Sequence, residues 1–388
     1  MVERFPKSLL EFQSLFSSDE ICTEYLVERR WPNGFVCPKC HGTAVWRLNS
    51  RPLWECRGCG RQTSITAGTL MAKTKLPLRV WFWAAYLMST HSNGLSALQL
   101  KGQLGVDYKT AWLLAAKLRR AMVNPDRSKL GGVVEIDQTE IPFRQENPPL
   151  GIGGRQGMIT VVGAVEIVDR VTGGPPRWAY NKKLLDTKAR RIRLQVIPNN
   201  LAPTLDAFVL ANVEPGSVIL TDDYPSYVNL SRLGYTHDPK TVGLMAAHVV
   251  LPWVHRVFAL LKRWGLGVYH GLRRKHVQTY LDEYCFRFNR RHWRRVSFEK
   301  ILGIASAKPA LYSHQITGGR PRNYQPDKTK RLAHPDTQGA ASDRAGASSV
   351  PPTVATRDIS ISLRALHPRN GTNHDIECSL IVLCLFTN

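Results

Sequence analysis

Two CxxC pairs near the start of the chain constrain its fold more than any other feature. The pairs Cys37/Cys40 and Cys56/Cys59 are separated by residues 41–55, a spacing typical of structural zinc sites. Four thiolates give Zn²⁺ the tetrahedral sulfur shell that it prefers, and they leave no position open for catalysis. The sequence therefore predicts a zinc ribbon with structural Zn²⁺. The alternative is four reduced cysteines without a metal.

The charge of the chain indicates a polyanionic partner. Lys and Arg outnumber Asp and Glu by 53 to 30, which gives a net charge of +23 and an isoelectric point of about 10.0. Such a balance favours nucleic acid. No apolar run reaches the roughly 18 residues that a membrane span needs, and the first residues lack the apolar core of a signal peptide. We therefore expect a cytoplasmic nucleic-acid-binding protein without a membrane partner.

A helix-turn-helix is predicted between residues 95 and 122. Ser96 can cap a first helix that ends near Leu104, and Gly105 suits the turn because it tolerates a left-handed backbone. Asp107 can cap a second helix, whose N-terminal residues would enter the major groove of DNA. A plain helical hairpin explains the same residues. The candidate DNA contacts on the second helix and on the zinc ribbon are Tyr108, Lys109, Thr110, Arg57 and Arg61.

From Gly131 onward the sequence has the pattern of a mixed α/β sheet. Apolar runs rich in Val and Ile predict strands at residues 133–136, 158–168, 191–197 and 218–221. Helices are expected at residues 201–212, 225–233, 250–264 and 272–291. Three strands followed by helix, strand and helix indicate an α/β fold in which helices cover a mixed sheet.

Two of the predicted strands end in a carboxylate, at Asp137 and at Asp222. An acid that closes a buried strand is held rigidly at the edge of the sheet. Two such acids on neighbouring strands can share divalent metal ions, which catalyse phosphoryl transfer. Carboxylate oxygens are the ligands that Mg²⁺ prefers. For either aspartate alone, a capping or turn role is the alternative.

Two further acids flank these aspartates. Asp223 would point away from Asp222 on a strand, so we expect it to cap a helix that begins near Tyr224. Glu135 shares a strand face with Asp137. It is a second candidate for the site, although it lies deeper in the strand.

The third metal ligand is expected on the helix at residues 250–264, which contains no acid. His255 and Lys262 are two turns apart on one face, at the margin of the apolar stripe. Lys262 can bind a phosphate as a point charge. The alternatives are a purely structural His255, and Asp282 or Glu283 on the next helix as the third ligand.

At these residues the sequence resembles the ISXO-like insertion-sequence transposases, in which a zinc ribbon precedes a DDE-type domain. The resemblance covers roughly residues 15–305. It is carried by the CxxC pairs and by residues 92–96, 108–112, 135–137, 221–222, 260–263 and 280–291. The resemblance implies an RNase H-like fold and a DNA transposase that uses divalent metal.

Matched residue by residue, the resemblance makes Asp137 and Asp222 the first two catalytic residues. The third, Glu or Asn in many members, falls on His255, and Lys262 matches the lysine that follows it. The family also includes a subgroup with His at this position, in a His-Arg-Val-Phe motif that occurs here at residues 255–258. A neutral imidazole favours softer ions such as Mn²⁺ over Mg²⁺, so the predicted catalytic cofactor is either Mg²⁺ or Mn²⁺.

The expected domain order has four parts. They are an N-terminal helix with the zinc ribbon (1–72), a helical region with the helix-turn-helix (73–125), the RNase H-like catalytic domain (126–310) and a disordered tail (311–388). The first two would bind terminal inverted repeats of double-stranded DNA. The third would cleave 3′ ends and transfer them to target DNA, within a homo-oligomeric synaptic complex at the bacterial nucleoid. The alternatives are an inactive or domesticated transposase that acts as a DNA-binding regulator, and a nuclease that only hydrolyses.

Overall fold

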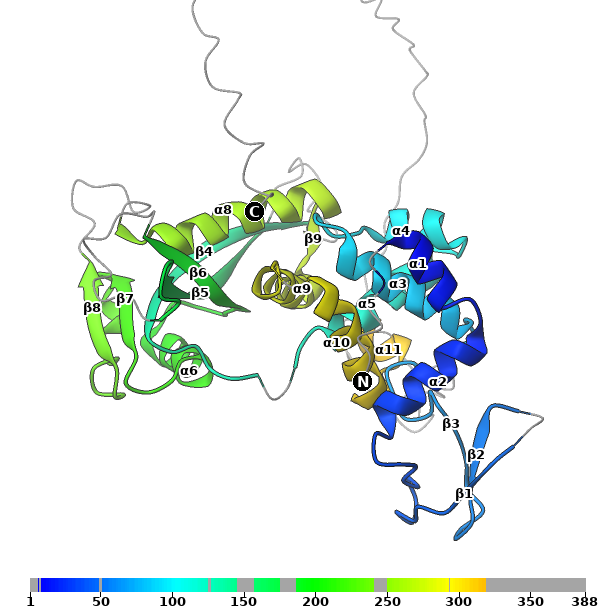
Figure 1. Ribbon diagram of the computed structural model, residues 1–388. Helices are drawn as coiled ribbons and strands as arrows, with labels where there is room; N and C mark the ends of the chain where they lie inside the picture. The colour runs from blue at the N-terminus through cyan, green and yellow to red at the C-terminus, as the bar shows by residue number, and fades with distance from the viewer. Residues whose placement is uncertain are drawn as a thin grey trace, which may run out of the picture. The chain divides into compact units, whose positions relative to one another are not determined.

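The computed structural model describes residues 6, 8–48, 51–124, 127–144, 157–174, 186–240, 250–292 and 294–318. The chain divides after Tyr324, so all of these residues belong to its first part. They form a small three-stranded sheet, a helical core and a larger mixed sheet (Figure 1). Of the predicted tail, residues 313–317 form the short helix α11 (Ser313–Thr317). The tail from residue 319 onward lies outside the described residues.

The helical core is built mainly from aromatic side chains. Phe12, Phe16, Phe82 and Phe298 are buried in it, and their rings pack edge-on or tilted against one another. Such ring pairs stabilise a core beyond the apolar area that they bury. The helices that contribute to it are α1 (Leu9–Leu15), α2 (Asp19–Arg30), α3 (Leu78–Thr90), α4 (Ala97–Leu104), α5 (Tyr108–Ala121) and α10 (Arg294–Ala307), together with Phe286 of α9 (Val277–Asn289).

Helix α10 belongs to this core although it follows the large sheet in sequence. Phe298, Ile301, Leu302 and Ala305 are fully buried in it. Their 3–1–3 spacing places them on one face of a helix. By sequence alone, α10 falls within the predicted catalytic domain. The helical core therefore combines helices from the N-terminal part of the chain with α10, which follows the large sheet.

The large sheet has the strand order β6–β5–β4–β7–β8. Its three long strands are antiparallel neighbours, whereas β4, β7 and β8 run parallel. This order and these directions are those of an RNase H-like domain, as predicted. The strands are β4 (Val133–Arg144), β5 (Gly157–Asp169), β6 (Thr187–Val196), β7 (Val218–Asp222) and β8 (Thr236–Lys240), with the short β9 (Leu272–Arg273) beside the end of β4.

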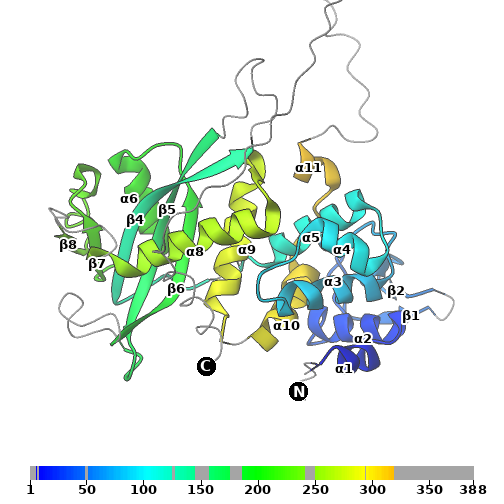
Figure 2. The same ribbon diagram turned by 90° about the horizontal axis from the view of Figure 1, so that it is seen from above.

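Helices cover both faces of this sheet (Figure 2). Helices α8 (Pro252–Tyr269) and α9 (Val277–Asn289) share one apolar core with the odd-numbered residues of β4. Helix α6 (Ala202–Asn212) packs against the even-numbered residues Val134 and Ile136 on the other face. Because side chains alternate along a strand, Glu135 and Asp137 must therefore face the α8 side.

The structure corrects the prediction for residues 225–233, which do not form a full helix. Only a 3₁₀ turn, η1 (Pro225–Tyr227), is present, and its N-cap residue is Tyr224 without a side-chain cap. Short turns here bury Tyr227 and Leu230 in the core under the sheet. Gly234, at φ +86°, then leads into β8. Strand β8 was not predicted because its residues, Thr-His-Asp-Pro-Lys, show no apolar pattern. It lies at the edge of the sheet, where a strand can contain proline.

Candidate active site and zinc centre

The four cysteines of the two CxxC pairs converge on one point. Their sulfur atoms all lie within 4.8 Å of one another, with Cys37 Sγ 3.6 Å from Cys59 Sγ and Cys40 Sγ 3.5 Å from Cys56 Sγ. Cys56 is the last residue of β2, and the other three lie outside the strands of the antiparallel sheet of β1 (Val45–Arg47), β2 (Leu53–Cys56) and β3 (Gln62–Ser64).

The two cysteine pairs have equivalent backbone geometry. The residue after each second cysteine, His41 or Gly60, has a positive φ of 59° or 66°. Its N–H donates to the carbonyl of the first cysteine of its pair. Backbone N–H groups also lower the pKa of Cys37 to about 6, with that of Cys40 as the largest contribution. This donor set fits Zn²⁺, which binds thiolates. The four cysteines would hold it as a structural ion.

We expect zinc removal to unfold the ribbon and leave the large sheet folded, because the sheet has its own two apolar cores and zinc binding contributes folding free energy directly. Hydrogen exchange with and without a strong chelator measures this. Protection should be lost at residues 35–66 and kept in β4 and β5. The variant Cys22→Ala, which changes a buried cysteine outside the cluster, should retain one zinc per chain. Uniform loss of protection would contradict the prediction.

The parallel pairing of β4 and β7 brings the two predicted catalytic aspartates together. Val133 lies opposite Val218, and Glu135 opposite Leu220. The same register, continued by two residues, sets Asp137 beside Asp222. Leu220 packs in the core on the α8 side, so Asp222 faces that side as well. Both carboxylates therefore open onto the same face of the sheet.

His255 joins this pair from the first turn of α8. Its Nε2 lies 3.3 Å from Oδ2 of Asp137. The imidazole is partly exposed, whereas Asp137 is buried. His255 therefore contacts Asp137 directly. Metal binding by Asp137, Asp222 and His255 together stays a prediction.

Glu135 fixes the start of α8. Its Oε2 accepts hydrogen bonds from the backbone N–H groups of Trp253 and Val254, each at 2.8 Å. The first N–H groups of a helix have no partner within the helix and carry a partial positive charge. Glu135 supplies the missing acceptor from a neighbouring strand. Glu135 lies on the predicted face of β4. It was expected as a second candidate for the metal site, whereas in the structure it anchors α8.

The electrostatics of the site favour a bound cation. Burial raises the pKa of Asp137 to about 7, and the charge of Asp222 adds to this rise. Burial also raises the pKa of Asp222. Oδ1 of Asp222 is buried and has no hydrogen-bond partner among the described residues. Two carboxylates at the same end of neighbouring strands, one with an unsatisfied oxygen, fit a divalent cation, which would neutralise both.

The rival acids on α9 are engaged elsewhere. The carboxylate of Glu283 is fully buried and accepts hydrogen bonds from Arg119, Arg287 and Tyr269. Asp282 accepts a hydrogen bond from Gln278. Glu283 is thus part of a structural ion-pair network. This disfavours Glu283 as the third metal ligand, and the role of His255 stays a prediction.

Two hydrogen bonds connect Tyr227 through Gln138 to Asp137. The N–H of Gln138 donates to Oδ1 of Asp137 at 2.7 Å, and the hydroxyl of the buried Tyr227 donates to Oε1 of Gln138 at 2.7 Å. Sequence reasoning missed Gln138 and Tyr227. Lys262 lies two turns beyond His255 on α8 and is half-buried.

Helices α4 and α5, with a short turn between them, lie where a helix-turn-helix is predicted. The helix-turn-helix itself stays a prediction. Ser96 caps α4 in a reciprocal capping box with Gln99, and Gly105 ends it at φ +64°. Asp107 is the N-cap residue of α5 but makes no side-chain cap hydrogen bond. The first residues of α5 are accessible: Tyr108 and Lys109 are exposed and Thr110 is half-buried. DNA contact by these residues stays a prediction.

On the ribbon, the two predicted DNA contacts are also exposed. The guanidinium of Arg57 lies 3.7 Å from the ring centroid of Trp46, which is itself exposed. Arg61 lies on the surface next to the second cysteine pair. No helix among the residues described here has the length and hydropathy of a membrane span.

The fold and the site together define an RNase H-like domain with an acidic centre for divalent cations, preceded by a four-cysteine ribbon. Both the domain with the large sheet and the four-cysteine ribbon match known protein families. Residues 129–289 match the ISXO2-like transposase domain, and residues 17–62 match the transposase zinc-ribbon domain. The chain therefore carries an ISXO2-like, DDE-type transposase domain together with the zinc ribbon of the same transposases.

Individual proteins that resemble this chain share low sequence identity with it. An uncharacterized protein in transposable element ISH50 of Halobacterium salinarum is 32% identical over 126 residues, which are 32% of this chain and 42% of that protein. The chain thus aligns with less than half of that relative. The crystal structure of the Mos1 strand transfer complex covers 55% of this chain and 74% of its own, at 14% identity and a TM-score of 0.23. The mariner Mos1 paired end complex with Mg gives 12% identity and a TM-score of 0.20, covering 57% of this chain and 76% of its own.

Proposed function

We propose that this protein is an insertion-sequence transposase that cleaves the 3′ ends of its element and joins them to target DNA. The observation that supports the proposal is that Asp137 and Asp222 lie at the same end of the paired strands β4 and β7, with His255 in contact with Asp137. The match of residues 129–289 to a transposase domain supports it. The chemistry is two successive phosphoryl transfers. Water attacks a phosphodiester and releases a 3′-OH, which then attacks a phosphodiester of the target.

Asp137, Asp222 and His255 would hold Mg²⁺ or Mn²⁺, which activates the attacking oxygen and stabilises the leaving one. The remaining roles belong to the protein alone. Glu135 holds the first turn of α8 and so positions His255. Lys262 would bind a DNA phosphate as a point charge.

The zinc ribbon and helices α4 and α5 would bind the terminal inverted repeats. The candidate contacts Arg57, Arg61, Tyr108 and Lys109 are exposed, and the chain has a net charge of +23. Neutralising phosphates releases counterions, so affinity for the ends should fall steeply with salt. Two or more protomers would hold the two ends of the element together, at the bacterial nucleoid.

The test is 3′-end cleavage of a labelled duplex that carries the terminal repeat and its flanking DNA. The expected result is a single nick at the element end in Mg²⁺ or Mn²⁺. Tight binding of the duplex without a nick in either metal would favour a DNA-binding regulator.

The role of Glu135 predicts a graded series. Glu135→Gln keeps an oxygen acceptor for the N–H groups of Trp253 and Val254, whereas Glu135→Ala leaves both unsatisfied. A buried donor without a partner costs about 1–3 kcal/mol, so the alanine variant should be less stable and should misplace His255. Chemical denaturation and single-turnover cleavage measure this. We expect the turnover rate of Glu135→Ala to fall about tenfold or more while end binding is unchanged. Equal activity of the two variants would contradict a positioning role.

A further inference from the structure

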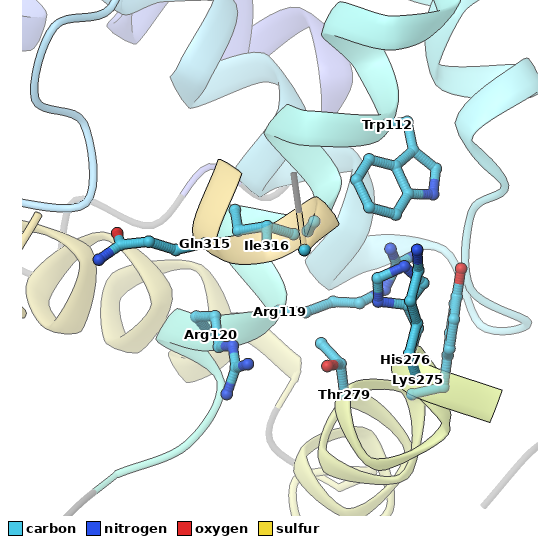
Figure 3. Close-up of a pocket in the computed structure, with 11 residues that line it drawn as sticks. Trp112, Arg119, Arg120, Lys275, His276, Thr279, Gln315 and Ile316 are labelled. Atoms are coloured by element: carbon cyan, nitrogen blue, oxygen red, sulfur yellow. The ribbon is translucent and has the colours of Figure 1, made fainter. Parts of the chain in front are cut away.

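A second site is present away from the aspartates, in a cavity of about 230 Å³. It lies between the C-terminal half of α5, the start of α9 and α11 (Figure 3). Arg119 extends from α5 into this region, with Arg120 and Lys275 on either side of it in the view of Figure 3. Trp112 and Ile316 give the cavity apolar walls, and Thr279 adds a hydroxyl.

The charge of this cavity is one-sided. Arg119, Arg120, Lys275 and His276 line it, and no Asp or Glu is among its lining residues. Arg120 and Lys275 are exposed at its rim. The charge of Arg119 is offset from behind by Glu283, and Asp282 offsets part of the charge of Arg120. Neither acid is among the lining residues, so the cations still outnumber the acids around the cavity. A hollow of this kind attracts an anion.

Arg119 is held in place at the back of the cavity. Its Nε donates to Oε2 of Glu283 at 2.6 Å, and its Nη2 lies 3.4 Å from the hydroxyl of Tyr269. Its guanidinium carbon lies 4.5 Å from the ring centroid of Tyr280. The position of this cation is therefore fixed by the protein before any anion binds.

We infer that the cavity binds a phosphodiester group of the DNA end, an inference that rests on the proposed function. Tyr108 and Arg119 stand eleven residues apart on α5, roughly 17 Å along the helix axis. That distance exceeds the ~12 Å width of the major groove. With the start of α5 in the groove, its far end can therefore reach the flanking sugar–phosphate backbone.

A phosphate held here would connect DNA binding to the catalytic sheet. Helix α9 lines the cavity at its start, and its side chains Gln278 and Asn289 accept hydrogen bonds from the backbone N–H groups of Val196 and Ile192 on the edge strand β6. The same helix thus contacts both the proposed phosphate and the sheet that carries Asp137. The site would set which phosphodiester of the end lies at the aspartates.

The first experiment measures the salt dependence of end binding by fluorescence anisotropy. The double variant Arg120→Ala/Lys275→Ala is compared with wild type and with Arg232→Ala/Lys188→Ala, which removes two exposed cations elsewhere. We expect the cavity variant to bind about tenfold more weakly and to lose about two units of the slope of log K against log salt. The control should match wild type. An unchanged slope in the cavity variant, with normal binding by wild type, would overturn the inference and leave the proposed function intact.

The second experiment locates the phosphate. Single methylphosphonate substitutions, which are neutral, are placed along the end duplex. Substitution at one backbone position should weaken binding by wild type. The same substitution should not affect the cavity variant, because the phosphate and the cavity are the two partners of one contact. If millimolar inorganic phosphate or a mononucleotide displaces the end duplex from wild type as well as unlabelled duplex does, the cavity binds a free anion instead. A wild type that binds the ends without salt dependence would contradict the proposed function itself.

Discussion

Asp222→Asn is expected to abolish end cleavage, with a loss of about 10³-fold or more, while the protein stays folded. The change keeps the size of the side chain and removes one of two carboxylates that would hold the metal. Loss of several kcal/mol of transition-state stabilisation corresponds to a loss of that size, since each 1.36 kcal/mol changes the rate tenfold. The measurement is single-turnover cleavage of the labelled end at saturating protein.

The neighbouring acid provides the matched control. Asp223 is exposed and lies one residue beyond β7, so Asp223→Asn should cleave like wild type. In the absence of metal, Asp222→Asn should be as stable as wild type or more stable. Burial is the main reason for the raised pKa of Asp137, and the substitution removes the repulsion by Asp222 that adds to it. Active sites often reduce stability in this way. A variant that loses both activity and stability would instead indicate a structural role for Asp222.

The largest expected loss of stability is at the buried network around Glu283. Replacing Glu283 with glutamine leaves the buried guanidinium of Arg119 and that of Arg287 without their counter-charge. Breaking a buried ion pair by removing one partner costs about 3–5 kcal/mol. Arg287 also donates to the carbonyls of Met88 and His91 at the end of α3. The network therefore ties α5, α9 and the helical core together, and all of them should lose stability.

Chemical denaturation with Glu299→Gln as the control tests this prediction. The Arg29–Glu299 pair is partly exposed, and such pairs contribute about 0–1 kcal/mol. The pH dependence gives a second readout. Although burial opposes it, Arg119 and Arg287 hold the pKa of Glu283 below its usual value. This contribution is present above the ordinary pKa of glutamate and is lost as the pH falls through the lowered pKa. Glu283→Gln should lack this acid-dependent loss. Equal stability of the two variants would contradict the account.

Local patterns were enough to predict the zinc centre and the two aspartates. The spacing of the CxxC pairs is a direct signature of a four-sulfur site. Asp137 and Asp222 each follow an apolar run long enough for a buried strand. The pairing of those two strands is a property of the sheet, and only the register of Val133 with Val218 shows that both aspartates lie at the same end of neighbouring strands.

The features that sequence reasoning missed depend on contacts between distant segments. Glu135 anchors α8 through Trp253, 118 residues further along the chain. Nothing near Glu135 indicates that helix. The four apolar residues of α10 predict a helix with one buried face, but not which core it joins. β8 was missed for a different reason, since an exposed edge strand needs no apolar pattern.

The most direct test of the central claim is joining. A duplex that already ends in the cleaved 3′-OH is incubated with wild-type protein and a target plasmid, in Mg²⁺ and in Mn²⁺, with Asp137→Asn and His255→Ala beside it. The account predicts covalent joining of the labelled end to the plasmid by wild type, and loss of the product with both variants. Cleavage of ends without any joined product would indicate a nuclease that only hydrolyses. Tight end binding with neither cleavage nor joining in both metals would contradict the transposase assignment.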